Sequence, residues 1–339
     1  MSSNGNPCIL YGELYTKYKS EIISEVISKT NIEKNKLKHS KQNDVIIPCS
    51  GETAVDIAVA RCVPFDNVLL GGDLNIIRLH KYDGAFMAYQ LNSKRKIEIA
   101  KLAQGVSVVH LYGENLKSIN TFNPSLQEQQ KIVRLLSLLD ERIKVQNKII
   151  EDLKKLKSAI SERFFTSING DVVTLADICD IVKGKQVNGE FLTDSGNYYV
   201  MNGGIEPSGY YDDYNTEANT ISISEGGNSC GYVQFNTTPF WSGGHCYTIQ
   251  NITNNVEKLY LYHYLKCNED TIMKLRIGSG LPNIQKKDLA KFRVIVPIIE
   301  QQKTISAFLS LLERKVQVET DILIAVQSEK QYLLRQMFI

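Results

Sequence analysis

The sequence predicts an α+β protein made of two pseudo-repeated globular domains separated by two long antiparallel helices that form a coiled coil. Three observations predict this class. The 339-residue chain repeats itself at an offset of 173 residues. Each copy opens with short β-branched runs and turns rich in Gly and Asn. Each copy closes with a heptad-like helical pattern that begins at a proline. The length suits two ordinary domains.

The internal repeat is densest near the end of each copy. The tetrapeptide Leu-Ser-Leu-Leu occurs at 136–139 and again at 309–312, and Pro124 lies opposite Pro297. Upstream, the copies drift by one or two residues, and Ile9 is expected to face Val200. The second copy opens with residues 174–185, which have no partner in the first copy. We therefore expect the first domain to start late.

These comparisons divide the chain into four segments. Residues 1–123 and 169–296 are the expected globular domains, and residues 124–168 and 297–339 are the expected long helices. Inside the second domain, residues 220–223 and 232–235 predict strands, because β-branched and aromatic residues dominate them. A proline suits the start of each helix, since the first turn does not need its missing N–H.

Apolar residues recur at alternating spacings of three and four through both helices, which is the pattern of a coiled-coil seam. Polar residues interrupt the two seams at matching positions, 146 with 319 and 157 with 330. Polar seam residues restrict the register. If a pseudo-twofold axis relates the two copies, their long helices run antiparallel. The helix pair would then act as a spacer about 60 Å long between the two globular domains. The predicted seam residues are Ile132, Leu136, Leu139, Ile143, Gln146, Ile150, Leu153, Lys157, Ile160 and Phe164, and Ile305, Leu309, Leu312, Val316, Glu319, Leu323, Val326, Lys330, Leu333 and Met337.

Further apolar residues lie beside the seam and make the apolar face of each helix wider than a coiled coil needs. We expect them to contact the globular domains or partner subunits, so that the isolated protein is poorly soluble and a coexpressed partner rescues it. These residues are Leu135, Leu138, Ile149, Phe165, Ile322, Ile324 and Leu334.

Charge and cysteine content exclude several classes of protein. The formal net charge is only +2, so any nucleic-acid surface must be a local patch. The apolar runs are short and no signal-peptide pattern is present, so we expect a cytoplasmic protein without a membrane span. The seven cysteines are odd in number and never spaced as in metal or redox motifs, which predicts reduced thiols and no metal site.

Short segments recur before and after the start of each helix. They are Leu289 to Pro297 followed by Glu300-Gln301-Gln302, and Pro124 followed by Glu128-Gln129-Gln130. Two more segments, Asn202 to Tyr210 and Pro239 to Cys246, lie in the second globular domain. With these segments in duplicated order, the chain resembles the specificity subunit of type I restriction-modification systems over essentially its whole length.

This resemblance implies a non-catalytic subunit with two target-recognition domains. Each domain would read one half of a bipartite double-stranded DNA target, and the coiled coil would set the unread gap. The implied partners are two type I methyltransferase subunits, with motor-nuclease subunits as an optional addition. The implied cofactor, S-adenosylmethionine, would bind the methyltransferase subunits and not this chain. The predicted architecture agrees, since two similar reading heads suit two half-sites at a set spacing.

Base readout requires side chains that present hydrogen-bond donors and acceptors from loops with small neighbours. Lys36 and Lys38 belong to a lysine-rich stretch that suits phosphate contacts and equally suits a solvated loop. The candidate DNA-binding residues are Tyr11, Tyr15, Lys36, Lys38, Ser50 and Arg78 in the first domain, and Asn202, Tyr210, Tyr211, Asn228, Ser229, Arg276, Ser279 and Asn283 in the second.

Motifs for catalysis in the chain itself are incomplete. Residues 123–126 lack the second proline and the aromatic residue of an adenine-positioning Asn-Pro-Pro-aromatic motif, and Gly184-Lys185 lacks the upstream glycine of a phosphate-binding loop. Two alternatives stay open. A coiled-coil scaffold or adaptor would show no salt-dependent DNA affinity. An enzyme acting on glycans or nucleotides would need paired acidic residues, which the two copies do not share.

Overall fold

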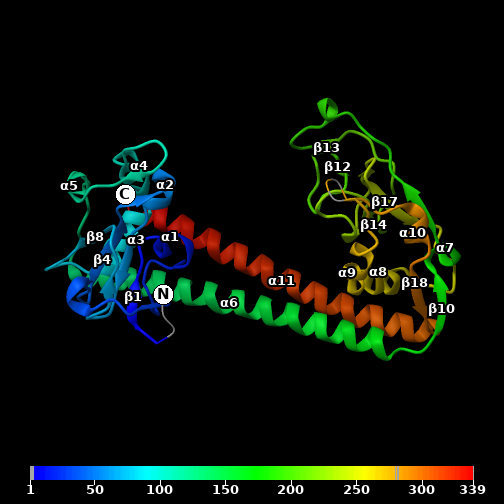
Figure 1. Ribbon diagram of the computed structural model, residues 1–339, viewed down its shortest axis with the longest axis horizontal. Coiled ribbons are helices and arrows are strands. Elements are labelled where there is room, and N and C mark those ends of the chain that lie inside the picture. The colour runs from blue at the N-terminus through cyan, green and yellow to red at the C-terminus, as the bar shows by residue number, and fades with distance from the viewer. Residues whose placement is uncertain (1–3, 279, 281, 339) are drawn as a thin grey trace. The chain divides into compact units, whose positions relative to one another are not determined.

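A computed structural model describes residues 4–278, 280 and 282–338 of the chain. The chain divides into two compact units, each described by itself below. Unit 1 comprises Met1–Lys148 and Thr320–Ile339, and unit 2 comprises Ile149–Glu319. The long helices α6 (Leu126–Ser167) and α11 (Ile299–Met337) each contribute residues to both units (Figure 1).

The globular part of unit 1 is built from short strands with small helices around them. The strands pair in the orders β2-β1-β7-β3, β6-β4-β8 and β5-β9. The elements are β1 (Asn6–Ile9), α1 (Glu13–Thr16), β2 (Ser28–Thr30), the 3-10 helix η1 (Lys34–Lys36), β3 (Lys38–His39), β4 (Asp44–Pro48), β5 (Ser50–Gly51), α2 (Ala54–Ile57), β6 (Arg61–Val63), β7 (Leu69–Leu70), β8 (Leu74–Ile77), α3 (Gly84–Asn92), α4 (Arg95–Lys101), β9 (Val109–His110) and α5 (Gly113–Leu116).

The globular part of unit 2 has strands in the orders β11-β17-β14-β15, β13-β12-β16 and β10-β18. The predicted strands at 220–223 and 232–235 are confirmed as β14 and β15. The elements are β10 (Asp171–Thr174), α7 (Leu175–Ile178), β11 (Asp180–Lys183), the 3-10 helix η2 (Gly189–Phe191), β12 (Tyr198–Met201), β13 (Tyr210–Tyr211), β14 (Thr220–Ser224), β15 (Val233–Asn236), β16 (Trp241–Ser242), β17 (Cys246–Gln250), α8 (Lys258–Cys267), α9 (Glu269–Met273), α10 (Lys286–Ala290) and β18 (Arg293–Val296).

The two units share one plan. The sheet β6-β4-β8 corresponds to β15-β14-β17, and the strands β2-β1-β7 correspond to β13-β12-β16. The pairs β1-β7 and β12-β16 are both parallel. Unit 2 adds α7 and β11, which fall within the stretch 174–185 that has no partner in the first copy. One detail of the expected alignment is wrong by one residue. Ile9 pairs with Leu70 as Met201 pairs with Ser242, so Ile9 corresponds to Met201 and not to Val200.

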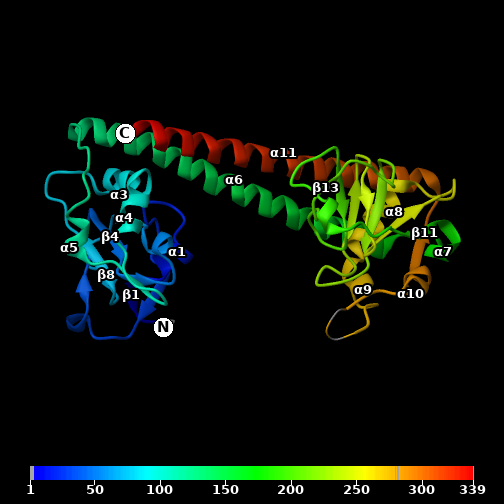
Figure 2. The same ribbon diagram turned by 90° about the horizontal axis from the view of Figure 1, so that it is seen from above.

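The long helices pair in antiparallel fashion within each unit, as predicted (Figures 1 and 2). In unit 1, Leu136 near the start of α6 packs in one cluster with Leu334 and Phe338 at the end of the chain. In unit 2, Phe164 near the end of α6 meets Phe308 of α11 edge to face, with ring centroids 5.9 Å apart. These clusters bury Leu136, Ile305 and Leu309 of the predicted seam, and they pack α3 and α8 against the long helices.

The polar interruptions of the seam form reciprocal ion pairs. Lys330 of α11 lies 2.5 Å from Asp140 of α6 in unit 1, and Lys157 of α6 lies 2.6 Å from Glu313 of α11 in unit 2. Each helix therefore provides an acid in its first half and a lysine in its second half. The two ion pairs therefore occupy equivalent positions of the sequence repeat.

Three global features bear on function. In the part of the chain that the structure describes, no helix is both long and apolar enough to cross a membrane. All seven cysteines are free. Burial raises the pKa of Cys62 to about 12 and that of Cys179 to about 12, which keeps these thiols protonated and unreactive at neutral pH.

Candidate nucleic-acid interface

Loops at one edge of unit 2 bring strand ends together. The carboxyl ends of β12 and β14 and the start of β17 meet there, because Glu225 N donates to His245 O and Asn202 Oδ1 accepts from His245 N. Gly226 pairs with Asn283 across an isolated bridge. The edge is polar and lined by glycine, which lets a ligand approach the backbone closely.

Several candidate residues of the second domain gather at this edge. Asn202 contacts the His245 backbone, and Asn283 bridges to Gly226. Asn228 and Ser229 form the turn that follows Gly227, whose N–H donates to Pro282 O. Arg276 is exposed and precedes the residue that pairs with Asn283. Ser279 lies outside the described residues.

Tyr210 and Tyr211 belong to a separate aromatic patch of the same unit. They form β13, which pairs with the first half of β12. The Tyr211 ring meets Trp241 edge to face at 5.1 Å, and Trp241 Nε1 donates to Lys185 O. Half-buried aromatic faces of this kind can stack on bases or serve only as packing.

Three polar residues at the same edge escaped prediction. Glu225 follows β14, Lys183 ends β11 and His245 precedes β17. Glu225 is buried and Lys183 Nζ donates to its carboxylate at 2.6 Å. The only sequence signal concerned His245, which lies in the segment 239–246 that is typical of the family the sequence resembles. This signal does not select a side chain.

In unit 1 the candidates separate into two groups. Tyr11 precedes α1 and Tyr15 lies within it, and the Tyr15 hydroxyl lies 3.4 Å from where a Cβ on Gly51 would be. Ser50 is buried next to Gly51 and donates to Asp73 Oδ2 at 3.1 Å. Tyr15 and Ser50 therefore lie close together in unit 1.

The remaining first-domain candidates are basic. Lys38 is exposed on β3, and Lys36 is exposed and lies 3.1 Å from Glu33. The Arg78 guanidinium donates to both oxygens of buried Asp44 at 2.9 and 2.8 Å, and this hydrogen bonding raises the pKa of Arg78. Arg78 is therefore already engaged by a carboxylate, whereas Lys38 is available to a phosphate. All these assignments stay predictions.

An exposed apolar loop in unit 1 was also missed. Val106 is 98% exposed and Val108 is half exposed. The loop is closed by paired backbone bonds between Gln104 and His110, and the His110 ring stacks on Tyr112. In DNA-binding proteins apolar side chains contact thymine methyl groups or enter base steps.

The same loop frame is present in unit 2. Ile277 and Asn283 exchange two backbone hydrogen bonds there, as Gln104 and His110 do in unit 1. The residue after the first partner is a glycine with positive φ in both units, +122° at Gly105 and +95° at Gly278. The repeat therefore preserves the paired hydrogen bonds that close the loop and the glycine that follows the first partner.

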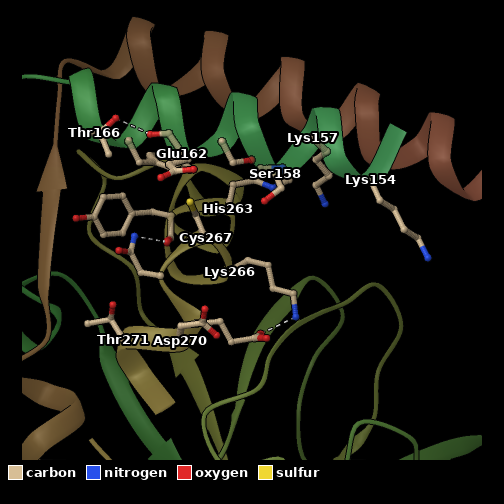
Figure 3. A pocket seen from close by; sticks show the side chains of 15 residues that line it. Lys154, Lys157, Ser158, Glu162, Thr166, His263, Lys266, Cys267, Asp270 and Thr271 are labelled. Carbon is tan, nitrogen blue, oxygen red and sulfur yellow. Dashed lines mark hydrogen bonds and ion pairs between the residues drawn. The ribbon is translucent and has the colours of Figure 1, made fainter. Parts of the chain in front are cut away.

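A pocket of about 660 Å³ in unit 2 lies between the second half of α6 and the helices α8 and α9 (Figure 3). Its lysines are largely engaged, Lys157 by Glu313 and Lys266 by Glu269. Its lining contains none of the candidate DNA-binding residues. Within the described residues no group of three or more His, Cys, Asp and Glu side chains could hold a metal ion.

Comparison with known families gives a match over most of the chain. The family model described as type I restriction modification DNA specificity domain matches residues 2–155 and 169–328.

Two curated relatives are similar over different lengths. A Mycoplasma pneumoniae protein described as a type I specificity subunit is 32% identical over 154 residues, 45% of this chain and 41% of that protein. A Mycoplasma genitalium protein with the same description is 24% identical over 281 residues, 78% of this chain and 73% of that protein. The chain thus spans less than half of the first relative.

Two solved structures share the fold. The crystal structure of a type I restriction-modification S subunit from M. genitalium has a TM-score of 0.70 at 22% identity, covering 98% of this chain and 92% of that one. A structure from a study of complex assembly and conformational transition in the type I restriction-modification system has a TM-score of 0.57 at 19% identity, covering 89% and 83%.

Proposed function

The chain belongs to the type I restriction modification DNA specificity family, and we propose that it is the DNA-reading subunit of a type I restriction-modification complex. It carries no catalytic machinery of its own and directs the chemistry of partner subunits to one DNA sequence.

One observation carries this proposal. Both units hold the same backbone frame around their loops, with matching hydrogen bonds at Gln104–His110 and Ile277–Asn283, while different side chains stand on it. A shared frame with different polar and apolar groups suits two modules that bind the same kind of polymer and read different sequences. A scaffold that binds one protein twice would not need this difference.

The division of labour follows the repeat. Residues 1–123 and 169–296 are the two target-recognition domains, and residues 124–168 and 297–339 are the helices that set the gap between half-sites. The antiparallel pairing and reciprocal ion pairs within each unit support a defined helix register.

The DNA contacts come from the loop edges. Asn202 and Asn283 in the second domain suit base edges, because amides offer both a donor and an acceptor. Lys38 in the first domain suits a phosphate. Binding is therefore expected to weaken as salt rises, since each neutralised phosphate releases counterions.

The partners are two methyltransferase subunits, which bind S-adenosylmethionine and methylate adenine. Support comes from apolar residues that stay exposed at matching positions, Leu135 with Phe308 and Leu138 with Leu311. Two equivalent stripes offer two equivalent docking sites. Motor-nuclease subunits join as an optional addition, and genomic DNA as target sets the place of action in the cytoplasm.

The test is base-resolution mapping of N6-methyladenine in cells that carry the cognate methyltransferase, with and without this chain. We expect one new bipartite motif with a fixed gap. A palindromic motif would instead indicate that a single competent domain acts through a dimer. No new methylation, together with no salt-dependent DNA affinity of the complex, would favour the scaffold alternative.

A further inference from the structure

A buried carboxylate lies at the centre of the loop edge in unit 2. Glu225 is only 6% exposed, and its Oε1 accepts hydrogen bonds from Lys183 Nζ and, at 3.0 Å, from Tyr247 OH. Its Oε2 is buried and makes no hydrogen bond to the described residues, while His245 Nδ1 lies 3.6 Å away. A buried oxygen without a partner costs free energy, because it has lost its hydration.

The His245 ring lies next to this carboxylate. The inner nitrogen Nδ1 faces Glu225, whereas the side chain as a whole is 63% exposed. A neutral imidazole that carries its proton on Nδ1, on the side of the carboxylate, has Nε2 as a hydrogen-bond acceptor. An acceptor at this outer position matches the amino groups of adenine and cytosine, which are the donors displayed in the major groove.

The backbone packs closely around His245. A Cβ on Gly203, where φ is +85°, would lie 3.0 Å from His245 O, and a Cβ on Gly226 would lie 3.8 Å from Nδ1. A Cβ on Gly243 would lie 2.6 Å from Asn202 Oδ1. Glycine at these places lets three loops meet at the base of the ring, which fixes its position on the surface.

The equivalent place in unit 1 has the same backbone and different chemistry. Cys49 N donates to Asp73 O, and Leu111 N donates to Cys49 O. In unit 2, Glu225 N donates to His245 O, and Ile284 N donates to Glu225 O. Glu225 and His245 thus occupy the frame positions of Cys49 and Asp73. Where the frame is constant, the side chains decide what each unit can bind.

We propose that His245 is a base-contacting residue that determines the specificity of the second recognition domain, and that Glu225 is its positioning residue. The ligand class is the amino edge of an adenine or a cytosine in duplex DNA. Lys183, half exposed and held by the same carboxylate, contacts a neighbouring phosphate. The inference rests on the proposed function and deepens it.

The test uses the full chain coexpressed with its methyltransferase and maps N6-methyladenine. In His245→Ala, one base position of the second half-site becomes permissive, and the preference for the matched base falls about tenfold. In Glu225→Gln, the same position relaxes. The first half-site stays unchanged in both variants, which shows that the complex is folded and active. The matched control is Glu217→Gln, an exposed carboxylate of the same unit, and it keeps the full motif.

Each contrary outcome has its own meaning. An unchanged motif and unchanged site occupancy in His245→Ala would overturn the proposal. A uniform loss of methylation with no relaxed base would reduce His245 to a non-specific contact and would also overturn it. Relaxation in His245→Ala without any change in Glu225→Gln would remove the positioning role. No bipartite motif with the unsubstituted chain would sink the proposed function itself.

Discussion

In each unit, one buried glutamine joins the globular part to a long helix. Gln129 and Gln302 are fully buried at matching positions of the repeat. Each Nε2 donates to the oxygen of the proline five residues earlier, at 2.8 and 2.7 Å. Each Oε1 accepts from the N-cap residue of a globular helix, Asp83 of α3 or Glu257 of α8. One amide thereby satisfies a donor and an acceptor that would otherwise be buried unpaired.

Gln302→Ala is expected to lower the free energy of unfolding by about 2–4 kcal/mol, because it leaves one buried and two partly buried backbone groups without partners. Urea unfolding of the full chain measures this loss, and hydrogen exchange should show a faster Glu257 amide. Gln301→Ala, the exposed neighbour, is the control and should change stability by under about 0.5 kcal/mol. Equal effects of the two substitutions would contradict the bridging role.

The buried His263 side chain is expected to make the free energy of unfolding depend on pH. Burial lowers the pKa of His263 from 6.5 to about 4, with Lys157 adding to the shift and Glu313 opposing it. The unfolded chain takes up a proton near pH 6.5 and the folded chain only near pH 4, so stability falls as the pH drops through this window, by up to about 3 kcal/mol.

Thermal unfolding at several pH values measures this dependence. His263→Gln should flatten the curve between pH 6.5 and 4, and the exposed His80→Gln should leave it as in the unsubstituted chain. A His263→Gln curve parallel to that of the unsubstituted chain would refute the assignment.

At the scale of the elements, the two long helices use the same ion pair in different surroundings. Lys330 is buried between Asp140 and Glu21, at 2.5 and 2.7 Å. Burial lowers the pKa of Lys330, but these two carboxylates outweigh it and the net pKa is raised. The equivalent pair of Lys157 and Glu313 is partly open to solvent. Ion pairs at equivalent positions of the repeat therefore contribute differently to the free energy of unfolding.

Lys330→Met is expected to destabilise the protein by about 3–5 kcal/mol, because two buried carboxylates lose their counter-charge. Lys157→Met should cost about 1 kcal/mol or less, as for a solvent-screened pair. Chemical unfolding of both variants gives the comparison. A larger loss of unfolding free energy in Lys157→Met than in Lys330→Met would contradict the expectation that the more deeply buried ion pair contributes more.

At the scale of the whole molecule, the helices have more apolar surface than their own pairing uses. Phe165 and Leu334 of the predicted wide stripe are buried, whereas Leu135, Leu138, Ile149 and Ile324 stay exposed. Leu311, equivalent to Leu138, is 65% exposed. Apolar side chains in matching exposed positions are typical of an interaction surface.

Leu311→Glu is expected to raise the soluble yield of the isolated chain and to weaken methyltransferase binding about tenfold or more, because a buried leucine is worth about 1.5–3 kcal/mol. Copurification and titration with the methyltransferase measure both effects. Lys303→Glu, an exposed position on the same helix, is the control. Unchanged methyltransferase binding in Leu311→Glu would show that the methyltransferase does not bind at this position.

The candidate site was predictable in part. Asn202, Asn228 and Asn283 gather at one loop edge, because glycine-rich turns with amides mark loops in any sequence. Arg78 and Ser50 instead face buried or acidic partners inside unit 1. Local composition does not reveal such partners, since Arg78 and Asp44 are 34 residues apart in the chain.

The sequence by itself determined the repeat, the two long helices, their seam residues and the family, because each of these depends on periodicity or order among neighbouring residues. Only the tertiary structure decided that Ile9 matches Met201, that Lys330 is buried between two carboxylates, and that Glu225 lies beneath His245. These facts depend on loop lengths and on contacts between distant segments. Such contacts have no period along the chain, and burial, which sets their energy, exists only after folding.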